Sequence, residues 1–180
     1  MKILPLVLLG ALTSACYLDG FEPSVESAGA AIPQLSQYDT FTFGWTGEPP
    51  FGYEPSARSL VVDRLLRELV GSALRQKGYV ENDDHPSFLV RFGSGILRVT
   101  SHPTEDADPL GVVPEEVLSY EGVQIVVYDM GLKTAVWRGS AHALIDPTKE
   151  VDMSLLHREV EGAFGTFPAR SITAAYPFRG

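Results

Sequence analysis

The order in which two hydrophobic periods follow one another along the chain limits its fold more than any other feature. Apolar and polar residues alternate in the stretch "YDTFTFGW", which places Phe41, Phe43 and Trp45 on one face of a strand. Apolar residues recur at helical spacing in residues 60–74 and again in residues 153–164. The chain therefore combines strands that bury one face with helices that bury one stripe.

Two later stretches also predict strands. "SFLVRF" turns Phe88, Val90 and Phe92 to one face, and "GVQIVVYD", "MGLK" and "TAVWRGSAHALI" together predict a β-hairpin. The intervening residues 93–121 are rich in Gly, Pro and acids, and a structureless connection of this length is uncommon in a compact domain. This segment is either mobile, or functional, or in part an extension of a strand, and its "GSG" at residues 93–95 is typical of a bend or bulge.

These elements predict an α+β two-layer sandwich with the order β-α-β-β-β-α. Ser56 or Ser59 can cap the first helix, Gly78 can end it, and the stretch "DPT" at residues 146–148 can begin the second helix. The apolar faces require a four-stranded sheet with both helices on one side. In the last strand, one large ring and several small residues are expected to face the helices: Ala135, Trp137, Gly139, Ala141 and Ala143.

The first residues, "MKILPLVLLGALTSAC", predict export from the cytoplasm. Lys2 precedes an apolar run of about ten residues and a set of small polar ones, which is typical of a secretory signal over residues 1–15 and too short for a transmembrane helix. "LTSAC" resembles a bacterial lipobox, in which the cysteine is acylated and becomes the new N-terminus. The alternative is an ordinary signal peptide that leaves the thiol free.

Cys16 is the only cysteine, so the chain has no disulfide framework and its lipid attachment would remove a free thiol from an oxidising compartment. If the cell is Gram-negative, Tyr17, in place of an aspartate that would favour inner-membrane retention, favours the outer membrane, with the domain facing the periplasm. We expect a lipidated cysteine and flexible tether over residues 16–36, a domain over 37–168 and a tail over 169–180.

The net charge of −9 argues against nucleic acid as a partner and against electrostatic binding to anionic lipid head groups. The expected contact with the membrane is therefore made by N-terminal acyl chains alone.

Several of these motifs occur together in one known family. The strand "YDTFTFGW", a helix that ends in "KGY", the strand "PSFLVRF", a hairpin with "VWRGSA" and a helix that ends in "FP" resemble the bacterial lipoproteins built on the domain of unknown function numbered four-one-three-six. The resemblance covers about residues 37–168. It implies an envelope-anchored α+β domain, and it brings no assigned activity, cofactor or catalytic residue.

No residue pattern predicts catalysis, a metal site or a cofactor. His85, His102, His142 and His157 lack the spacing of metal ligands, and the acidic loop around His102 lacks the order of a calcium loop. Ser94 or Ser140 could be drawn beside His142 or His102, but a seryl hydrolase also needs an oxyanion hole and an orienting acid. We expect a protein that is not an enzyme.

The face of the sheet without helices is the best candidate for function. Tyr128, Arg138, His142 and Arg91 are expected there, and Tyr and Arg are enriched at protein interfaces. Val136 is expected on the same face, and a solvated half-polar face would have a similar composition. The sequence is interpreted as a non-enzymatic envelope lipoprotein that contacts another envelope protein; the alternative is a module that binds a lipid or another hydrophobic ligand.

Overall fold

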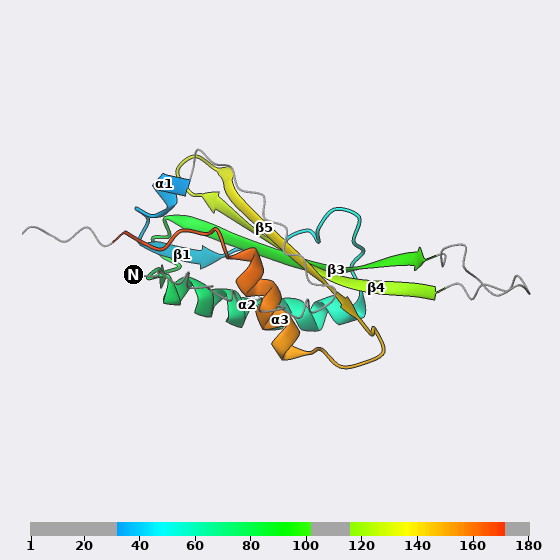
Figure 1. Cartoon of the computed structure of the whole chain (residues 1–180). Coiled ribbons are helices and arrows are strands. Elements are labelled where there is room, and N and C mark those ends of the chain that lie inside the picture. Colours follow the sequence, from blue (N-terminus) through cyan, green and yellow to red (C-terminus); the bar gives the residue numbers. More distant parts are fainter. Residues whose placement is uncertain (1–31, 102–115, 172–180) are drawn as a thin grey trace, which may run out of the picture.

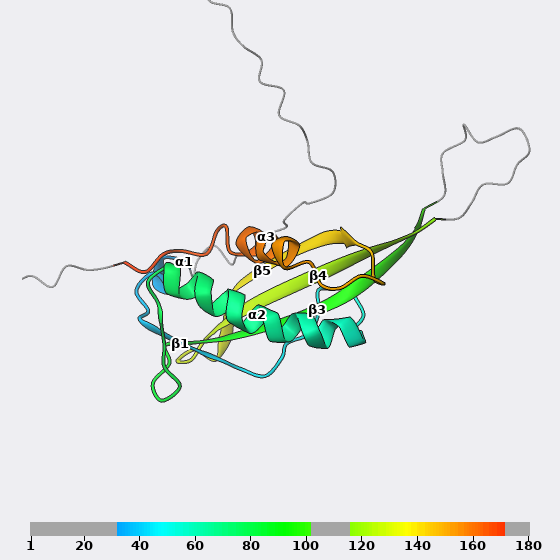
Figure 2. The ribbon, with the colours of Figure 1, turned by 90° about the horizontal axis from the view of Figure 1, so that it is seen from below.

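The computed structural model describes residues 32–101 and 116–171, which form a mixed five-stranded sheet with two long helices on one face (Figures 1 and 2). The strand order is β2-β1-β3-β4-β5. The elements are α1 (Ile32–Leu35), β1 (Thr40–Phe43), α2 (Ala57–Gln76), β2 (Val80–Glu81), β3 (Phe88–Ser101), β4 (Glu116–Asp129), β5 (Thr134–Ile145) and α3 (Met153–Ala163). None of the helices in these residues is both long enough and apolar enough to cross a bilayer.

The predicted α+β class is confirmed, and the sheet has one strand more than predicted. β1 runs parallel to both β2 and β3, whereas β3, β4 and β5 form an antiparallel meander. The additional strand, β2, contains two residues. A strand of that length has no alternating pattern that a sequence could reveal.

Most of the long segment after Phe92 extends the sheet. β3 and β4 pair without a register shift from Phe88 opposite Asp129 to Ser101 opposite Glu116. Of the alternatives for residues 93–121, the extension of a strand is the one observed. Residues 93–101 extend β3, and residues 116–121 begin β4. The predicted bend or bulge at "GSG" is wrong, because pairing continues through all three residues.

The first long helix has the predicted ends. Ser56 is its N-cap, and Gly78 has a φ of +93° directly after the C-cap. Tyr79 N–H donates to the Leu74 carbonyl (3.1 Å), which is the closing bond of a Schellman motif.

The second long helix begins later than predicted. Asp146 closes a turn in which its carboxylate accepts from the backbone N–H of Thr148 (3.0 Å), so residues 146–148 are not helical. Asp152 is the N-cap of α3 and accepts from the backbone N–H groups of Ser154 and Leu155. Met153, the first residue of the predicted stripe, is 46% exposed.

The core lies between the sheet and the two helices. Phe41, Phe88 and Trp137 are at most 1% exposed, and the Trp137 ring stacks on Phe164, the C-cap of α3 (5.3 Å between centroids). Gly139 admits that helix as predicted, because a Cβ there would lie 2.4 Å from the Ala163 carbonyl oxygen.

The predicted directions of three side chains are wrong: those of Trp45, Ala135 and Val136. Trp45 is 90% exposed because β1 ends at Phe43 and the chain leaves the sheet. A register shift in the β4–β5 pairing makes Ala135 exposed and buries Val136, so alternation reverses at the start of β5.

The packed domain begins before residue 37. Leu35 of α1 is fully buried, and its carbonyl accepts from Tyr79 OH (3.0 Å). The last described residue returns to the same place, where Ser171 N–H donates to the Ser36 carbonyl (2.6 Å).

Candidate functional site

The sheet has an outer face, defined here as the face opposite α2 and α3, and it carries the candidate site. Ser94 Oγ donates to the Asp63 carboxylate of α2 (2.8 Å), so Ser94 points to the helices. Side chains alternate along a strand, and Arg91, Gly93 and Gly95 therefore face outward. Trp137 faces α3 in the same way, which turns Arg138 to the outer face.

The loop of residues 44–56 crosses the middle of the outer face, as the cyan segment of Figure 1 shows. Gly47 N–H donates to the Phe92 carbonyl (2.6 Å), and Glu54 pairs with Ile96. A Cβ at Gly93 would lie 2.6 Å from the Gly47 carbonyl oxygen, and one at Gly122 would lie 2.6 Å from the Tyr53 ring. Gly93 and Gly95, which the sequence suggested as a bulge, are thus the residues on which this loop packs.

Beside the loop, two cross-strand rows face outward. Arg91 pairs with Val126, which pairs with Arg138, so two guanidinium groups flank one apolar residue. Strands in a sheet are about 4.8 Å apart, so the backbones of the two arginines are roughly 10 Å apart. The next row consists of Leu89, Tyr128 and Ala135.

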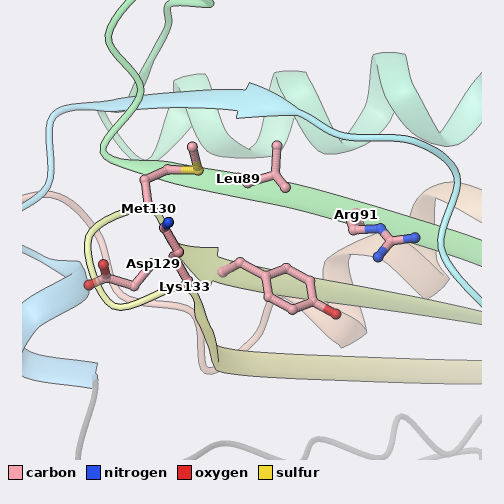
Figure 3. Close-up of a pocket in the computed structure, with 6 residues that line it drawn as sticks. Leu89, Arg91, Asp129, Met130 and Lys133 are labelled. Carbon is pink, nitrogen blue, oxygen red and sulfur yellow. The ribbon is translucent and has the colours of Figure 1, made fainter.

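A hollow of about 310 Å³ lies over these rows, and the residues that line it are Leu89, Arg91, Tyr128, Asp129, Met130 and Lys133 (Figure 3). Arg91 and Lys133 lie at its opposite ends, with Leu89 between them, and the Asp129 carboxylate points away. Arg91 is held in place because it donates to the carbonyls of Trp45 (3.3 Å) and Thr46 (3.4 Å). The hollow thus has an apolar floor and a cation at each end.

Asp129 is not available to neutralise these cations. Its carboxylate accepts from Tyr38 OH and from Leu132 N–H (2.7 Å). The Tyr38 hydrogen bond, with the backbone bonds, lowers the pKa of Asp129, while burial and the same bond raise the pKa of Tyr38 to about 12.

A second hollow of about 240 Å³ lies on the other side of the Arg91–Arg138 row. Its lining residues are Pro50, Phe51, Tyr53, Gln124, Arg138, Ser140, Ala141 and His142. The His142 ring meets the Tyr120 ring edge to face (6.3 Å between centroids). Arg138 has no ion-pair partner within residues 32–101 and 116–171.

Large apolar side chains of the crossing loop and of the β4–β5 turn are exposed, and two of them, Phe51 and Met130, line the hollows. Trp45 and Phe51 of the crossing loop are 90% and 104% exposed, and Met130 and Leu132 of the β4–β5 turn are 43% and 62% exposed. We call Arg91, Lys133 and Arg138 the basic patch and these four apolar residues the apolar rim. Exposed apolar groups that gather on one face mark an interaction surface.

The predicted interaction residues are brought together in pairs. Arg91 and Tyr128 line the first hollow, and Arg138 and His142 line the second. The sequence did not indicate Lys133 or the apolar rim, because turn and loop residues follow no period. Cys16 and His102 lie outside the described residues.

The serine–histidine arrangement drawn from the sequence does not form with Ser94, because Ser94 faces the helices and His142 faces outward. In residues 32–101 and 116–171, no three His, Cys, Asp or Glu side chains are grouped as metal ligands.

A second polar cluster lies beneath the sheet. Arg58 of α2 donates to Glu121 of β4 through Nε (3.1 Å) and a second guanidinium nitrogen (3.4 Å), and Glu121 is 2% exposed. Glu159 of α3 is fully buried and neither of its carboxylate oxygens has a hydrogen-bond partner. Burial, with the nearby Glu121 charge, raises the pKa of Glu159 to about 9.

The burial of Glu159 could have been predicted from the helical spacing of the sequence. Glu159 lies three residues after Leu156 and four before Ala163, both of which belong to the predicted apolar stripe. The helical period therefore places this carboxyl group in the core.

Comparison with known proteins identifies a family. A family model described as "Domain of unknown function (DUF4136)" matches residues 25–169. No curated protein sequence matches the chain.

Solved structures with some similarity come from several bacteria. A PelC dodecamer from Paraburkholderia phytofirmans is 9% identical with a TM-score of 0.44, and the match covers 84% of this chain and 96% of that one. A PDZ domain protein from Parabacteroides distasonis is 11% identical with a TM-score of 0.47, over 84% and 36% of the chains. A neuraminyllactose-binding hemagglutinin homolog from Helicobacter pylori is 13% identical with a TM-score of 0.39, over 70% and 78%. At these values the similarity says nothing about function.

Proposed function

Because this chain belongs to the DUF4136 family, whose description assigns no function, we propose a role for it from its own residues. It is a non-enzymatic lipoprotein of the bacterial envelope whose α+β domain uses the outer face of the sheet as a contact surface. The observation that carries this proposal is the grouping of the basic patch and the apolar rim on the one sheet face that no helix covers, in a chain of net charge −9.

The attachment to the envelope rests on Cys16. A signal-like segment ends in the only cysteine of the chain, and a diacylglycerol on that cysteine would supply the two acyl chains that stable anchoring needs. The anchor would hold the domain on the periplasmic side of the outer membrane.

The contact surface rests on composition and geometry. Arginine and aromatic side chains supply much of the energy of known interfaces, and both types occur here around two shallow hollows. Arg91 is fixed by two carbonyl groups before any partner binds, so little side-chain entropy is lost on contact.

A hydrophobic-ligand module remains the second candidate, because the floor of the first hollow is formed by Leu89 and Tyr128. Such sites usually bury most of the ligand surface, whereas Met130 at this hollow is 43% exposed. Native mass spectrometry of the protein extracted in mild detergent separates the two candidates, since only the second one predicts a retained small molecule.

Site-specific photo-crosslinking in intact cells tests the proposal. A photoreactive amino acid replaces Lys133 or Arg138 on the outer face, and the matched control replaces Arg64, which is exposed on α2. We expect adducts with other envelope components from residues 133 and 138 and few from residue 64. Equal labelling from all three positions, or none from any, would contradict the use of this face.

The anchor is tested separately by intact mass. The mature protein should exceed the mass of the chain from Cys16 by a diacylglycerol and an acyl group, and Cys16→Ala should abolish the increment and release the protein from membranes. An unmodified wild-type mass would overturn the anchor.

A further inference from the structure

We propose that the component contacted by the outer face is the anionic phospholipid surface of the bilayer itself. This inference rests on the proposed function, because it assigns a partner to the same face. The domain would then lie against the membrane with the basic patch and the apolar rim at the head groups.

The first reason is the chemistry of the exposed side chains. Interfacial membrane-binding surfaces combine Trp, Phe and Leu with Lys and Arg, because aromatic rings settle at head-group depth and cations attract anionic lipids. In the crossing loop Trp45 and Phe51 are almost fully exposed, and in the β4–β5 turn Met130 and Leu132 are exposed on the same short segment as Lys133.

The second reason is the distribution of charge. The net charge of −9 belongs to the whole chain, whereas the two outward rows carry Arg91 and Arg138 and contain no acidic residue in β3, β4 or β5. Three exposed carboxylates oppose the contact: Glu48 and Glu54 belong to the crossing loop, and Asp83 accepts from Thr42 Oγ1 beside the row of Leu89. Cations near an anionic surface attract it, and the three carboxylates offset part of this attraction. The exposed apolar rim therefore supplies much of the binding, and single charge substitutions change it.

The third reason is the point at which the chain enters the domain. Cys16 and Ile32 are 16 residues apart (32 − 16), so the entry point lies within roughly 60 Å of the anchor even when that segment is fully extended. Tyr38 bonds to Asp129, which places the entry beside the β4–β5 turn that carries Met130, Leu132 and Lys133. A surface held so close to the membrane has a high effective concentration, and a weak contact is then well populated.

The chain carries its own probe for this contact. It has two tryptophans, of which Trp137 is 1% exposed in the core and Trp45 is 90% exposed on the rim. The lipidated protein is reconstituted into vesicles of phosphatidylethanolamine and phosphatidylglycerol that contain brominated lipid, a short-range quencher of tryptophan fluorescence. We expect most of the Trp45 emission to be quenched and Trp137 to be unaffected, with Trp45→Phe removing the quenched component.

Charge variants test whether the basic patch causes the membrane contact. Lys133→Glu/Arg138→Glu should abolish the quenching, Glu48→Gln should increase it, and phosphatidylcholine vesicles should show much less of it. The matched control, Arg64→Glu/Arg158→Glu, reverses two exposed cations on the helices and should leave the quenching unchanged. Circular dichroism of each variant reports whether it folds.

Unquenched Trp45 in anionic vesicles, or equal loss of quenching in both double variants, would overturn the membrane contact. If crosslinks from residues 133 and 138 then lead to an envelope protein, the proposed function stands and only this inference fails. If those crosslinks are absent and the mass lacks acyl chains, both fail.

Discussion

Glu159 is the residue at which burial and ionisation conflict most directly. It is fully buried on α3, its carboxylate oxygens have no hydrogen-bond partner, and the neighbouring Glu121 is already paired with Arg58. A second negative charge in this place would be poorly solvated, so the native state keeps Glu159 protonated at neutral pH. The group therefore acts as a polar neutral side chain in the core.

Glu159→Gln should stabilise the protein in a pH-dependent way. The pKa of Glu159 rises from 4.5 to about 9 on folding, so the native state retains a proton that the unfolded chain releases, and stability falls as pH rises between these values. The amide does not titrate, and its advantage should be absent near pH 4 and about 3 kcal/mol at pH 7. Urea unfolding across this pH range measures it.

Glu68→Gln, at an exposed position of α2, is the control and should show little pH dependence. A wild-type stability that does not fall relative to Glu159→Gln between pH 5 and pH 8 would contradict the buried neutral carboxyl group.

At the scale of elements, the loop of residues 44–56 packs closely on β3 and β4 because glycines occupy the contact positions of these strands. Gly93, Gly95 and Gly122 leave room for the loop backbone and for Tyr53 on an unbroken ladder. The loop in turn positions Trp45, and the carbonyl of Trp45 positions Arg91.

Gly122→Ala should displace the loop without unfolding the sheet. The new methyl group would lie 2.6 Å from the Tyr53 ring, so the ring must move, and overpacking of this kind costs about 1–3 kcal/mol. Hydrogen exchange should become faster in residues 47–54 and stay slow in β4. Unchanged exchange in the loop would show that Tyr53 does not depend on this glycine.

Gly71→Ala should stabilise the protein, whereas Gly122→Ala should destabilise it. Gly71 is in the interior of α2, and the nearest atom to a new Cβ is the end of the flexible Arg75 side chain (3.1 Å). Alanine in a helix interior is favoured over glycine by about 0.5–1 kcal/mol. Thermal unfolding should show a rise in midpoint of a few degrees, and a fall would mean that Arg75 cannot move aside.

The elements with a strong period could be predicted from the sequence, and the site could be predicted in part. The Schellman end of α2, the β4–β5 hairpin and the outward direction of Arg91 and Arg138 follow from local rules. The exposure of Trp45 could not be predicted, because the alternating pattern continues past Phe43, where the strand β1 ends. Val136 could not be placed either, because a register shift depends on pairing with β4.

At the scale of the whole molecule, the described chain closes on itself without a disulfide. Arg170 N–H donates to the Lys77 carbonyl (2.8 Å) and Ser171 N–H donates to the Ser36 carbonyl (2.6 Å), so these two residues join the segment after α1 to the end of α2. Arg170 also pairs with Asp39 (2.6 Å). The C-terminal segment therefore holds the start of the domain in place.

A chain that ends at Phe167 should be less stable than one that ends at Ser171. The shorter chain loses the two backbone bonds and the hydrogen bond from Tyr79 OH to the Pro168 carbonyl, at about 0.5–1.5 kcal/mol each. Chemical denaturation should show a loss of roughly 2–4 kcal/mol for the shorter chain. Equal stability of the two chains would mean that residues 168–171 only lie against the domain.

The meeting of Ser36 and Ser171 makes the connectivity of the domain almost that of a ring. A circular permutant that joins Ser171 to Ile32, four residues before Ser36, by a short linker and opens the chain at the β4–β5 turn would keep the buried Leu35 and every strand pairing of the sheet. For the same reason the domain is an insertable unit, which could be placed within a loop of another protein through two neighbouring junctions.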